Sequence, residues 1–302
     1  MRRKKHFWLL CLGSLFTAAL LLGGCSAGST TPAPVDGLDT LGAVQVISRE
    51  DGSGTRSAFA GLVGFDTSTD GTKEDDTTDD AIIMDSTEAV IAAVADHSAA
   101  IGYISMGAAT NSADIKILAV DGIEATTENV QDNSYSLSRP FSLAWSGKLN
   151  DLEQDFLTYV LGSGQAIVGQ SYVAVNSSST FLSGQYEGTI TIHGSTSAAP
   201  LLAELAEAYM EINPHAIIEV TASDSTTGLN DAMQGACDFA MSSRALKDYE
   251  QELLDYEVIA QDGIAVIVNS LNPLTDITTE ELNDIFTGSI NDWAAINTDR
   301  EG

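Results

Sequence analysis

The feature of this sequence that most limits its fold is the regular alternation of strand-like and helix-like segments. Short apolar runs such as residues 44–47 and 189–193 are each followed, after a few small polar residues, by stretches with helical spacing at 56–63 and 199–210. A helix between two strands carries the chain back across a sheet, so that successive strands run parallel. We therefore expect an α/β fold with mainly parallel sheets.

The same alternation runs through most of the chain. Further helices are expected over residues 87–96, 152–161, 228–234 and from 278 to 286. Further strands are expected over residues 101–104, 115–120, 217–220, 239–241 and 264–268. The Ser- and Gly-rich residues 176–188 are expected to connect two halves of the chain, and the acidic residues 65–80 to form a loop.

Residues 1–24 predict an export signal rather than a part of the fold. Four basic side chains at residues 2–5 precede an apolar run at 7–22, which ends in Leu-Gly-Gly before Cys25. The pattern resembles a bacterial lipoprotein signal, in which Cys25 would be lipidated and residues 25–41 would form a tether. A plain signal peptide and a retained membrane anchor are the alternatives. We expect the protein on the extracellular face of the cell membrane, held by its lipid.

The charge of the chain excludes some classes of partner. The sequence has 13 Lys and Arg residues against 43 Asp and Glu residues, a formal net charge of −30. Nucleic acid and anionic membrane surfaces are therefore not expected as partners. A small anion stays possible, because salt screens the global field beyond about 8–10 Å and local donors then decide binding.

No metal and no cofactor are expected. His97, His193 and His215 are scattered and lack the spacing of metal ligands. Residues 66–71 resemble the first half of a calcium loop, but Thr77 stands where the loop needs a Glu. A solvated acidic loop explains this segment better.

Three strand-to-helix turns carry the candidate chemistry. They are residues 51–56 (DGSGTR), 194–197 (GSTS) and 223–228 (SDSTTG). Each places hydroxyl side chains at the first turn of an expected helix, where backbone N–H groups are unpaired and the helix dipole is positive. Such turns suit phosphate or sulfate, although a single one could be an ordinary N-cap. Three together, with Arg49 available for a bidentate contact, favour an oxyanion site.

Several blocks of the sequence together resemble the phosphate-binding proteins of the phosphate ABC transporter. The blocks are residues 49–56 (REDGSGTR), 101–104 (IGYI), 120–123 (VDGI), 137–140 (LSRP), 190–201 (ITIHGSTSAAPL), 241–244 (MSSR), 262–269 (DGIAVIVN) and 285–293 (IFTGSINDW). The resemblance covers most of residues 42–293. It implies a two-lobed, periplasmic-binding-protein-like fold of type II with a central ligand cleft that closes over the anion.

The order of the blocks is reversed relative to that family. The block that opens the family sequence begins here at residue 190, after the block that the family places later. The chain therefore resembles a circular permutant, which is tolerable when termini are close and the new ends fall in an exposed loop. Two half-modules that swap with a second chain are the alternative. The resemblance implies that residues 42–106 and 264–302 form lobe two and residues 107–263 form lobe one, with crossings near 104–115 and 262–269.

The resemblance also implies the ligand-binding residues. They are Thr196, Ser197, Ser225 and Ser243 in lobe one, and Arg49, Asp51, Ser53, Gly54 and Thr55 in lobe two. Asp51 would hold Arg49 or accept the proton of hydrogen phosphate. Some family members have an Asp at the position of Ser243, so selectivity for phosphate over sulfate would here depend more on Asp51.

The function implied by the resemblance is that of a receptor without enzymatic activity. It would capture inorganic phosphate, or a similar oxyanion, outside the membrane and deliver it to the permease subunits of an ABC importer. A binder of sulfate or molybdate, and a surface sensor or adhesion module of the same fold, are the alternatives. A phosphatase is disfavoured because the sequence offers no metal cluster and no activated nucleophile.

Overall fold

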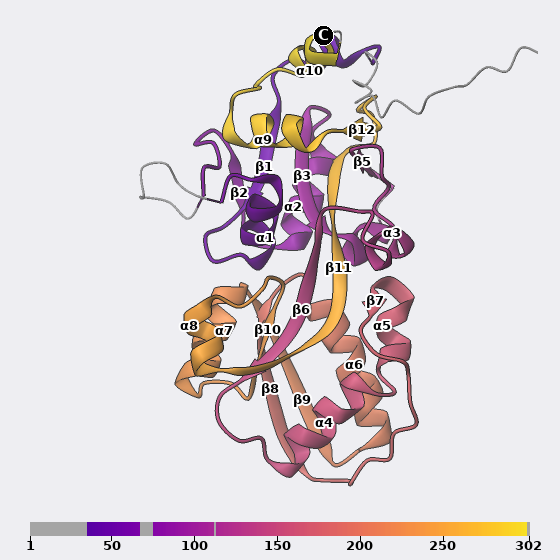
Figure 1. Cartoon of the computed structure of the whole chain (residues 1–302), viewed down its shortest axis with the longest axis vertical. Helices are drawn as coiled ribbons and strands as arrows, with labels where there is room; N and C mark the ends of the chain where they lie inside the picture. The colour runs from indigo at the N-terminus through magenta and orange to yellow at the C-terminus, as the bar shows by residue number, and fades with distance from the viewer. Residues whose placement is uncertain (1–34, 67–74, 112, 301–302) are drawn as a thin grey trace, which may run out of the picture. The chain divides into compact units, whose positions relative to one another are not determined.

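The computed structural model describes residues 35–66, 75–111 and 113–300, all of which fall within one compact unit (Figure 1). The expected export signal, the expected lipid site at Cys25 and most of the expected tether lie outside these residues. Within the described ranges, no helix combines the length and the apolar character that crossing a bilayer requires.

Strands and helices alternate along the described chain. The strands are β1 (Gln45–Arg49), β2 (Ile82–Met84), β3 (Ala100–Ser105), β4 (Ile115–Ile117), β5 (Ala119–Val120), β6 (Ser138–Trp145), β7 (Val173–Ala174), β8 (Gly188–Ser195), β9 (Ala216–Ser223), β10 (Phe239–Ser242), β11 (Asp255–Asn269) and β12 (Asp276–Ile277). The helices are α1 (Gly54–Val63), α2 (Thr87–Asp96), α3 (Thr127–Gln131), α4 (Asp151–Leu161), α5 (Gln165–Ser171), α6 (Ala199–Ile212), α7 (Ser225–Gln234), α8 (Asp248–Leu253), α9 (Thr279–Thr287) and α10 (Trp293–Arg300). Short 3-10 helices cover Leu38–Thr40 and Met106–Asn111.

Lobe two has a parallel set of strands in the order β2-β1-β3, beside which the C-terminal half of β11 runs antiparallel. Its core lies between this sheet and helices α1, α2 and α9. Phe59 of α1 stacks on Tyr103 of β3 with ring centroids 4.1 Å apart, and Phe286 of α9 meets Phe59 edge-on at 4.9 Å. Helix α9 starts at the expected capping box, in which Thr278 and Glu281 bond reciprocally.

Lobe one repeats the design with the parallel order β10-β8-β9. Next to β10, β6 runs antiparallel to it, and β11 runs antiparallel to β6. Helices α4 and α6 cover one face, and Phe156, Tyr209 and Phe239 lie in the core there. Helix α7 covers the other face with a smaller apolar cluster around Leu229. Both lobes therefore place parallel strands so that helices begin at the same sheet edge.

Strands β6 and β11 carry the chain between the lobes (Figure 1). β11 pairs with β6 over residues 255–263 and with β3 over 264–268, so that one strand serves both lobes. β11 passes from lobe one to lobe two between residues 263 and 264, within the range 262–269 where a crossing was expected.

The first crossing was predicted wrongly, and with it the start of lobe one. Leu118, Val130 and Tyr135 pack in the core of lobe two, not of lobe one. The physical reason is strand pairing, because β4 pairs with the C-terminal half of β11 and β5 pairs with β12. The chain leaves lobe two at β6, beyond residue 137, rather than near 104–115.

The described N-terminal segment is fastened to the last helix of lobe two. The Val35 backbone N–H donates to Asn297 Oδ1 at 2.7 Å, and Asn297 Nδ2 donates to the Val35 carbonyl at 2.8 Å. Trp293 and Ile296 of the same helix α10 are buried in the core of lobe two. Both ends of the described chain therefore lie on lobe two.

Candidate functional site

Four helix N-termini meet where the two lobes face each other. Helices α1 and α2 begin in lobe two behind the N-caps Ser53 and Ser86, and α7 begins in lobe one behind Asp224. Helix α6 begins after residues 194–197 without a side-chain cap. Positive dipole ends therefore converge from both lobes, and Ser53, Ser86 and Asp224 each accept one of the first helical N–H groups.

Buried hydroxyl groups fill the space between these helix ends. We call this set the hydroxyl cluster, and its members are Thr55, Thr87, Ser195, Thr196, Ser197, Ser225 and Ser243. None of them is more than 9% exposed. The three hydroxyl-rich turns of the sequence thus come together at one place.

Within lobe one, Ser243 joins two turns. The Ser195 hydroxyl donates to Ser243 Oγ at 2.8 Å, and the Ser243 backbone N–H donates to Ser225 Oγ at 3.1 Å. Ser195 is the last residue of β8, whereas Ser225 and Ser243 follow the ends of β9 and β10. Adjacent parallel strands therefore deliver their carboxyl ends to one point, as in other open α/β sheets.

Across the lobes, hydroxyl groups bond directly to one another. Thr55 Oγ1 lies 2.9 Å from Ser197 Oγ, and Thr87 Oγ1 lies 3.1 Å from the same atom. The Thr226 backbone N–H of α7 also donates to the Gly52 carbonyl at 3.2 Å. Because each hydroxyl can donate or accept, these bonds can be exchanged for bonds to an oxyanion.

Gly54 allows the N-terminus of α1 to approach lobe one closely. A Cβ at this position would come within 2.2 Å of Ser225 Oγ and 2.7 Å of Ser243 Oγ. Any side chain would therefore push the lobes apart or displace both hydroxyls. Glycine is required at position 54 because a side chain would not fit, and not because of its backbone dihedral angles.

Arg49 is buried but already paired. Its Nη2 and Nε each lie 2.7 Å from a carboxylate oxygen of Glu50, and Nε also donates to the Met84 carbonyl. The expectation that Asp51 holds Arg49 is therefore wrong. Nη1 of Arg56, at the start of α1, donates to the Arg49 carbonyl and to Asp51 Oδ1. The Asp51 carboxylate is therefore bonded to Arg56 and not to the Arg49 guanidinium.

Asp51 lies at the periphery of the site, with a side chain that is 78% exposed. Arg56 instead makes its buried ion pair with Asp75, at 2.8 Å. Burial alone would raise the pKa of Asp75, but hydrogen bonds from Arg56 and Thr77 outweigh it and hold this pKa below its ordinary value. This pair fixes the turn that presents Ser53, Gly54 and Thr55.

Arg139 is a site residue for which the sequence reasoning gave no role. Its Nη1 donates to the Ser243 carbonyl at 3.1 Å, and its Nη2 lies 3.0 Å from Asp262 Oδ2. Ser105 Oγ donates to the other oxygen of Asp262 at 2.9 Å. Burial lowers the pKa of Arg139 and raises that of Asp262, and the attraction between the two charges opposes both shifts. The pair ties both crossing strands to the hydroxyl cluster.

Thr87 and Ser195 were also missed. Thr87 follows the N-cap of α2, and its only sequence signal was a polar residue at the start of an expected helix. Ser195 lies inside one of the three turns but was not given a role of its own. Their contribution depends on which turns face each other, which no local pattern reveals.

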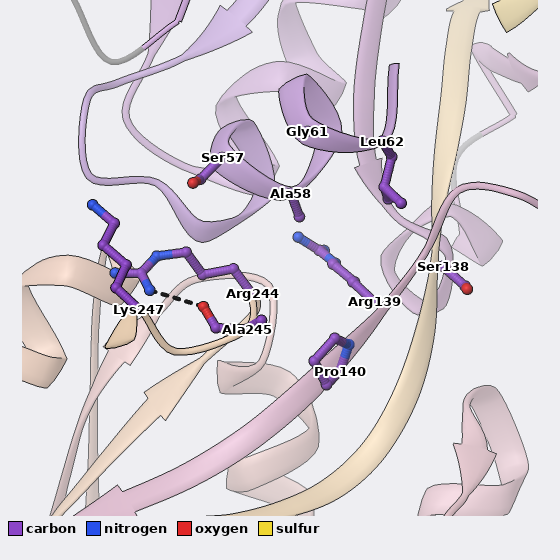
Figure 2. Close-up of a pocket in the computed structure, with 10 residues that line it drawn as sticks. All are labelled: Ser57, Ala58, Gly61, Leu62, Ser138, Arg139, Pro140, Arg244, Ala245 and Lys247. Atoms are coloured by element: carbon purple, nitrogen blue, oxygen red, sulfur yellow. Dashed lines mark hydrogen bonds between the residues drawn. The ribbon is translucent and has the colours of Figure 1, made fainter. Parts of the chain in front are cut away.

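A hollow of about 280 Å³ opens beside the cluster, with α1 on one side and residues of lobe one on the other (Figure 2). Arg139, Arg244 and Lys247 line it. In the described part of the chain, no group of His, Cys, Asp and Glu side chains is placed to hold a metal ion. The arrangement suits reversible binding of a small anion by hydroxyl and N–H donors.

Comparison with known proteins gives a consistent picture. A family model described as a PBP superfamily domain matches residues 39–163 and 179–301. Phosphate-binding protein PstS 2 of Streptococcus pneumoniae serotype 4 is 36% identical over 299 residues, which cover 98% of this chain and 100% of that protein. A crystal structure of a phosphate-binding protein of a phosphate ABC transporter from the TIGR4 strain matches with a TM-score of 0.69 and 38% identity, over 84% of this chain and all of that one.

A relative from another genus matches only in part. Phosphate-binding protein PstS of Bacillus subtilis is 39% identical over 110 residues, which are 35% of this chain and 36% of that protein. The agreement with the streptococcal protein, in contrast, runs from end to end.

Proposed function

Because the chain belongs to the phosphate-binding protein family of the PBP superfamily, we propose that it captures inorganic phosphate outside the membrane and delivers it to the permease subunits of an ABC importer. It is a binding protein and not an enzyme. The observation that carries the proposal is the hydroxyl cluster, to which both lobes contribute at converging helix N-termini. Such donors replace the water around a small anion without needing a cation in direct contact.

A second candidate ligand is an oxyanion that carries no proton, such as sulfate or molybdate. Asp51, the expected proton acceptor, is exposed and paired with Arg56. Around the cluster, Glu50 is paired with Arg49 and Asp262 with Arg139, whereas Asp224 caps α7, accepts hydrogen bonds from Thr227 and has no cation partner among the described residues. Three of these four carboxylates, those of Asp51, Glu50 and Asp262, therefore have a compensating cation, which reduces their repulsion of a fully ionised ligand.

Isothermal titration calorimetry of the chain without residues 1–24 tests both candidates. Phosphate, arsenate, sulfate and molybdate are titrated separately. Binding of phosphate and arsenate alone supports the first candidate, and equal binding of sulfate supports the second. Absence of heat with all four anions, together with no competition between them in equilibrium dialysis, would contradict both.

A matched pair of variants locates the site. Thr55→Val removes the hydroxyl that meets Ser197, and we expect a loss of phosphate affinity of about tenfold, a typical cost of a lost hydrogen bond to a charged group. Thr158→Val is the control, because the Thr158 hydroxyl is exposed on α4 and bonds only within its own helix. Equal affinities of the two variants would place the site elsewhere.

We further propose that Cys25 carries a lipid that anchors the protein outside the cell membrane. Support comes from the Leu-Gly-Gly-Cys sequence behind a basic and then apolar segment. Radiolabelled palmitate should be incorporated into the unaltered protein, and Cys25→Ser should abolish both labelling and retention in the membrane fraction. Labelling that survives the substitution would refute the lipid site.

The circular permutation also stands as a proposal. It is supported by the reversed order of the motif blocks and by the match to the Bacillus relative, which spans only about a third of either chain, whereas the streptococcal relative that matches from end to end shares the order of this chain. The contact between Thr55 and Ser197 lies within one chain, which agrees with a permuted monomer. Light scattering should give the mass of one chain, with one phosphate bound per chain. An obligate dimer would favour swapped half-modules.

A further inference from the structure

The hollow beside the hydroxyl cluster gathers positive charge in a strongly acidic protein. Arg139, Arg244 and Lys247 surround it, and none of the described residues that line it is acidic (Figure 2). The whole sequence has only 13 basic residues against 43 acidic ones. Two of these cations are paired with buried carboxylates, so the opening contributes one uncompensated positive charge, that of Lys247, in a strongly acidic protein.

The three cations differ in their availability. Arg139 is paired with Asp262 and Arg244 with Glu250, and both arginines are almost fully buried. Lys247 is exposed and forms no ion pair with any carboxylate of the described residues. It also borders a second hollow with Asp66 and Asp75, of which Asp75 is neutralised by Arg56. Asp66 has no cation partner among the described residues and offsets part of the field of Lys247, which is nevertheless not bonded to it.

The buried cations connect the hollow to the cluster. Arg139 donates to the Ser243 carbonyl, inside the cluster. Arg244 Nη2 donates to Thr226 Oγ1 at 3.2 Å, next to the backbone contact between Thr226 and Gly52 that joins the lobes. Two residues that line the hollow therefore contact the hydroxyl cluster or a residue next to it.

We propose that this hollow is the entrance through which the oxyanion reaches the hydroxyl cluster, and that Lys247 is the cation that attracts the anion to it. The inference rests on the proposed function. An exposed charge at an entrance raises the local concentration of counter-ions and so the association rate, while it leaves the bound anion, which lies deeper, in unchanged contacts. Lys247 is accordingly a steering residue and not a ligand of the bound state.

The test separates association from dissociation of inorganic phosphate. Affinity is measured by calorimetry, and dissociation is followed after rapid mixing of the loaded protein with an excess of a fluorescent phosphate reporter. At about 0.01 M salt we expect Lys247→Gln to slow association about threefold and Lys247→Glu about tenfold. Dissociation should stay within about twofold, and the differences should vanish at about 1 M salt.

Lys148→Gln is the matched control, because it removes the same charge from an exposed lysine beyond the opposite end of β6 from Arg139. Equal association rates for Lys247→Gln and Lys148→Gln, with normal binding by the unaltered protein, would overturn this inference alone. Faster dissociation at unchanged association would also overturn it, since Lys247 would then contact the bound anion. No phosphate binding by the unaltered protein would overturn the proposed function and the entrance with it.

Discussion

At the scale of single residues, the site depends on how closely α1 approaches lobe one. Gly54 lies against Ser225 and Ser243 without room for a methyl group. The requirement is local, because Gly61 of the same helix has room for a Cβ, with the nearest atom Asp66 Oδ2 at 3.7 Å. Gly54 therefore has no room for a Cβ whereas Gly61 has, and the phosphate affinities of alanine variants at the two positions can be compared.

We expect Gly54→Ala to weaken phosphate binding at least about tenfold, because the added Cβ would separate the lobes or displace two hydroxyls, a change of the overpacking kind. Calorimetry with phosphate measures the effect. Gly61→Ala is the control and should leave affinity within about twofold. Similar affinities of both variants and the unaltered protein would mean that α1 does not close on the ligand.

The sequence predicted the hydroxyl-rich turns because the chemistry is local to each turn. Thr55, Ser197, Ser225 and Ser243 come together in the structure, Ser53 caps α1 beside them, and their contacts with a ligand stay a prediction. The partner of Arg49 could not be predicted in the same way. Whether Glu50 or Asp51 reaches its guanidinium is decided by Arg56, which lies on the next helix.

At the scale of elements, the crossing strands β6 and β11 are joined by a fully buried ion pair. Arg139 and Asp262 have almost no exposed side-chain surface. Removal of one partner leaves an uncompensated charge in the interior, which is far more costly than the loss of an exposed pair. This pair therefore matters for stability as well as for the position of Ser243.

We expect Asp262→Asn to lower the free energy of unfolding by about 3–5 kcal/mol, because Arg139 loses its buried counter-charge. Urea unfolding followed by circular dichroism measures the change. Asp51→Asn removes the same charge from an exposed pair with Arg56 and should cost no more than about 1 kcal/mol. Comparable losses in the two variants would show that burial of the pair is not what makes it important.

Helix α8 gives a pH-dependent prediction. Burial would raise the pKa of Glu250, but hydrogen bonds from Arg244 and the Lys247 backbone outweigh it, so the pKa lies below its ordinary value of 4.5. A carboxyl group with a lowered pKa stabilises the fold above its unfolded-state pKa, and this contribution is lost as pH falls through the lowered value.

The free-energy difference between the unaltered protein and Glu250→Gln should therefore be largest near neutral pH and shrink below about pH 4. Urea unfolding at a series of pH values measures it. Glu257→Gln, at an exposed position in β11, is the control for the loss of one negative charge. A difference that grows on acidification would contradict the sign of the shift.

The elements that the sequence reasoning missed share a physical reason. β6 contains Arg139 and Pro140, which disfavour a strand assignment, yet Pro140 lies opposite Gln261 in the pairing with β11. The first half of β11 is polar and partly exposed, and α8 has only six residues. Tertiary pairing stabilises these segments, whereas the strongly periodic helices such as α2 and α4 could be predicted from their own residues.

At the scale of the whole molecule, the ligand should stabilise both lobes together. Residues of the hydroxyl cluster come from both, so a ligand that binds only the closed form favours the folded state of each. Trp145 lies beside the core of lobe one and Trp293 in that of lobe two, and each can report on its own lobe.

We expect phosphate at about 100 times its dissociation constant to raise the free energy of unfolding by about 2.7 kcal/mol. The chain without residues 1–24 lacks Trp8. In this chain, the fluorescence of Trp293 reports on lobe two in Trp145→Phe, and that of Trp145 reports on lobe one in Trp293→Phe. Both urea midpoints should rise by the same amount with phosphate and stay unchanged with chloride at equal ionic strength. A rise in one lobe alone would place the ligand outside the interface of the lobes.

The fastening of Val35 to α10 has a mechanical consequence if Cys25 is the proposed anchor. Ten peptide units then separate the bilayer from lobe two, a leash of at most about 35 Å. The attachment point on lobe two would then stay within that distance of the bilayer, whereas lobe one is joined to the anchor only through lobe two and the strands β6 and β11. An importer in the same bilayer would therefore meet lobe two at a limited distance, and the position of lobe one relative to lobe two would differ between the free and the anion-bound protein.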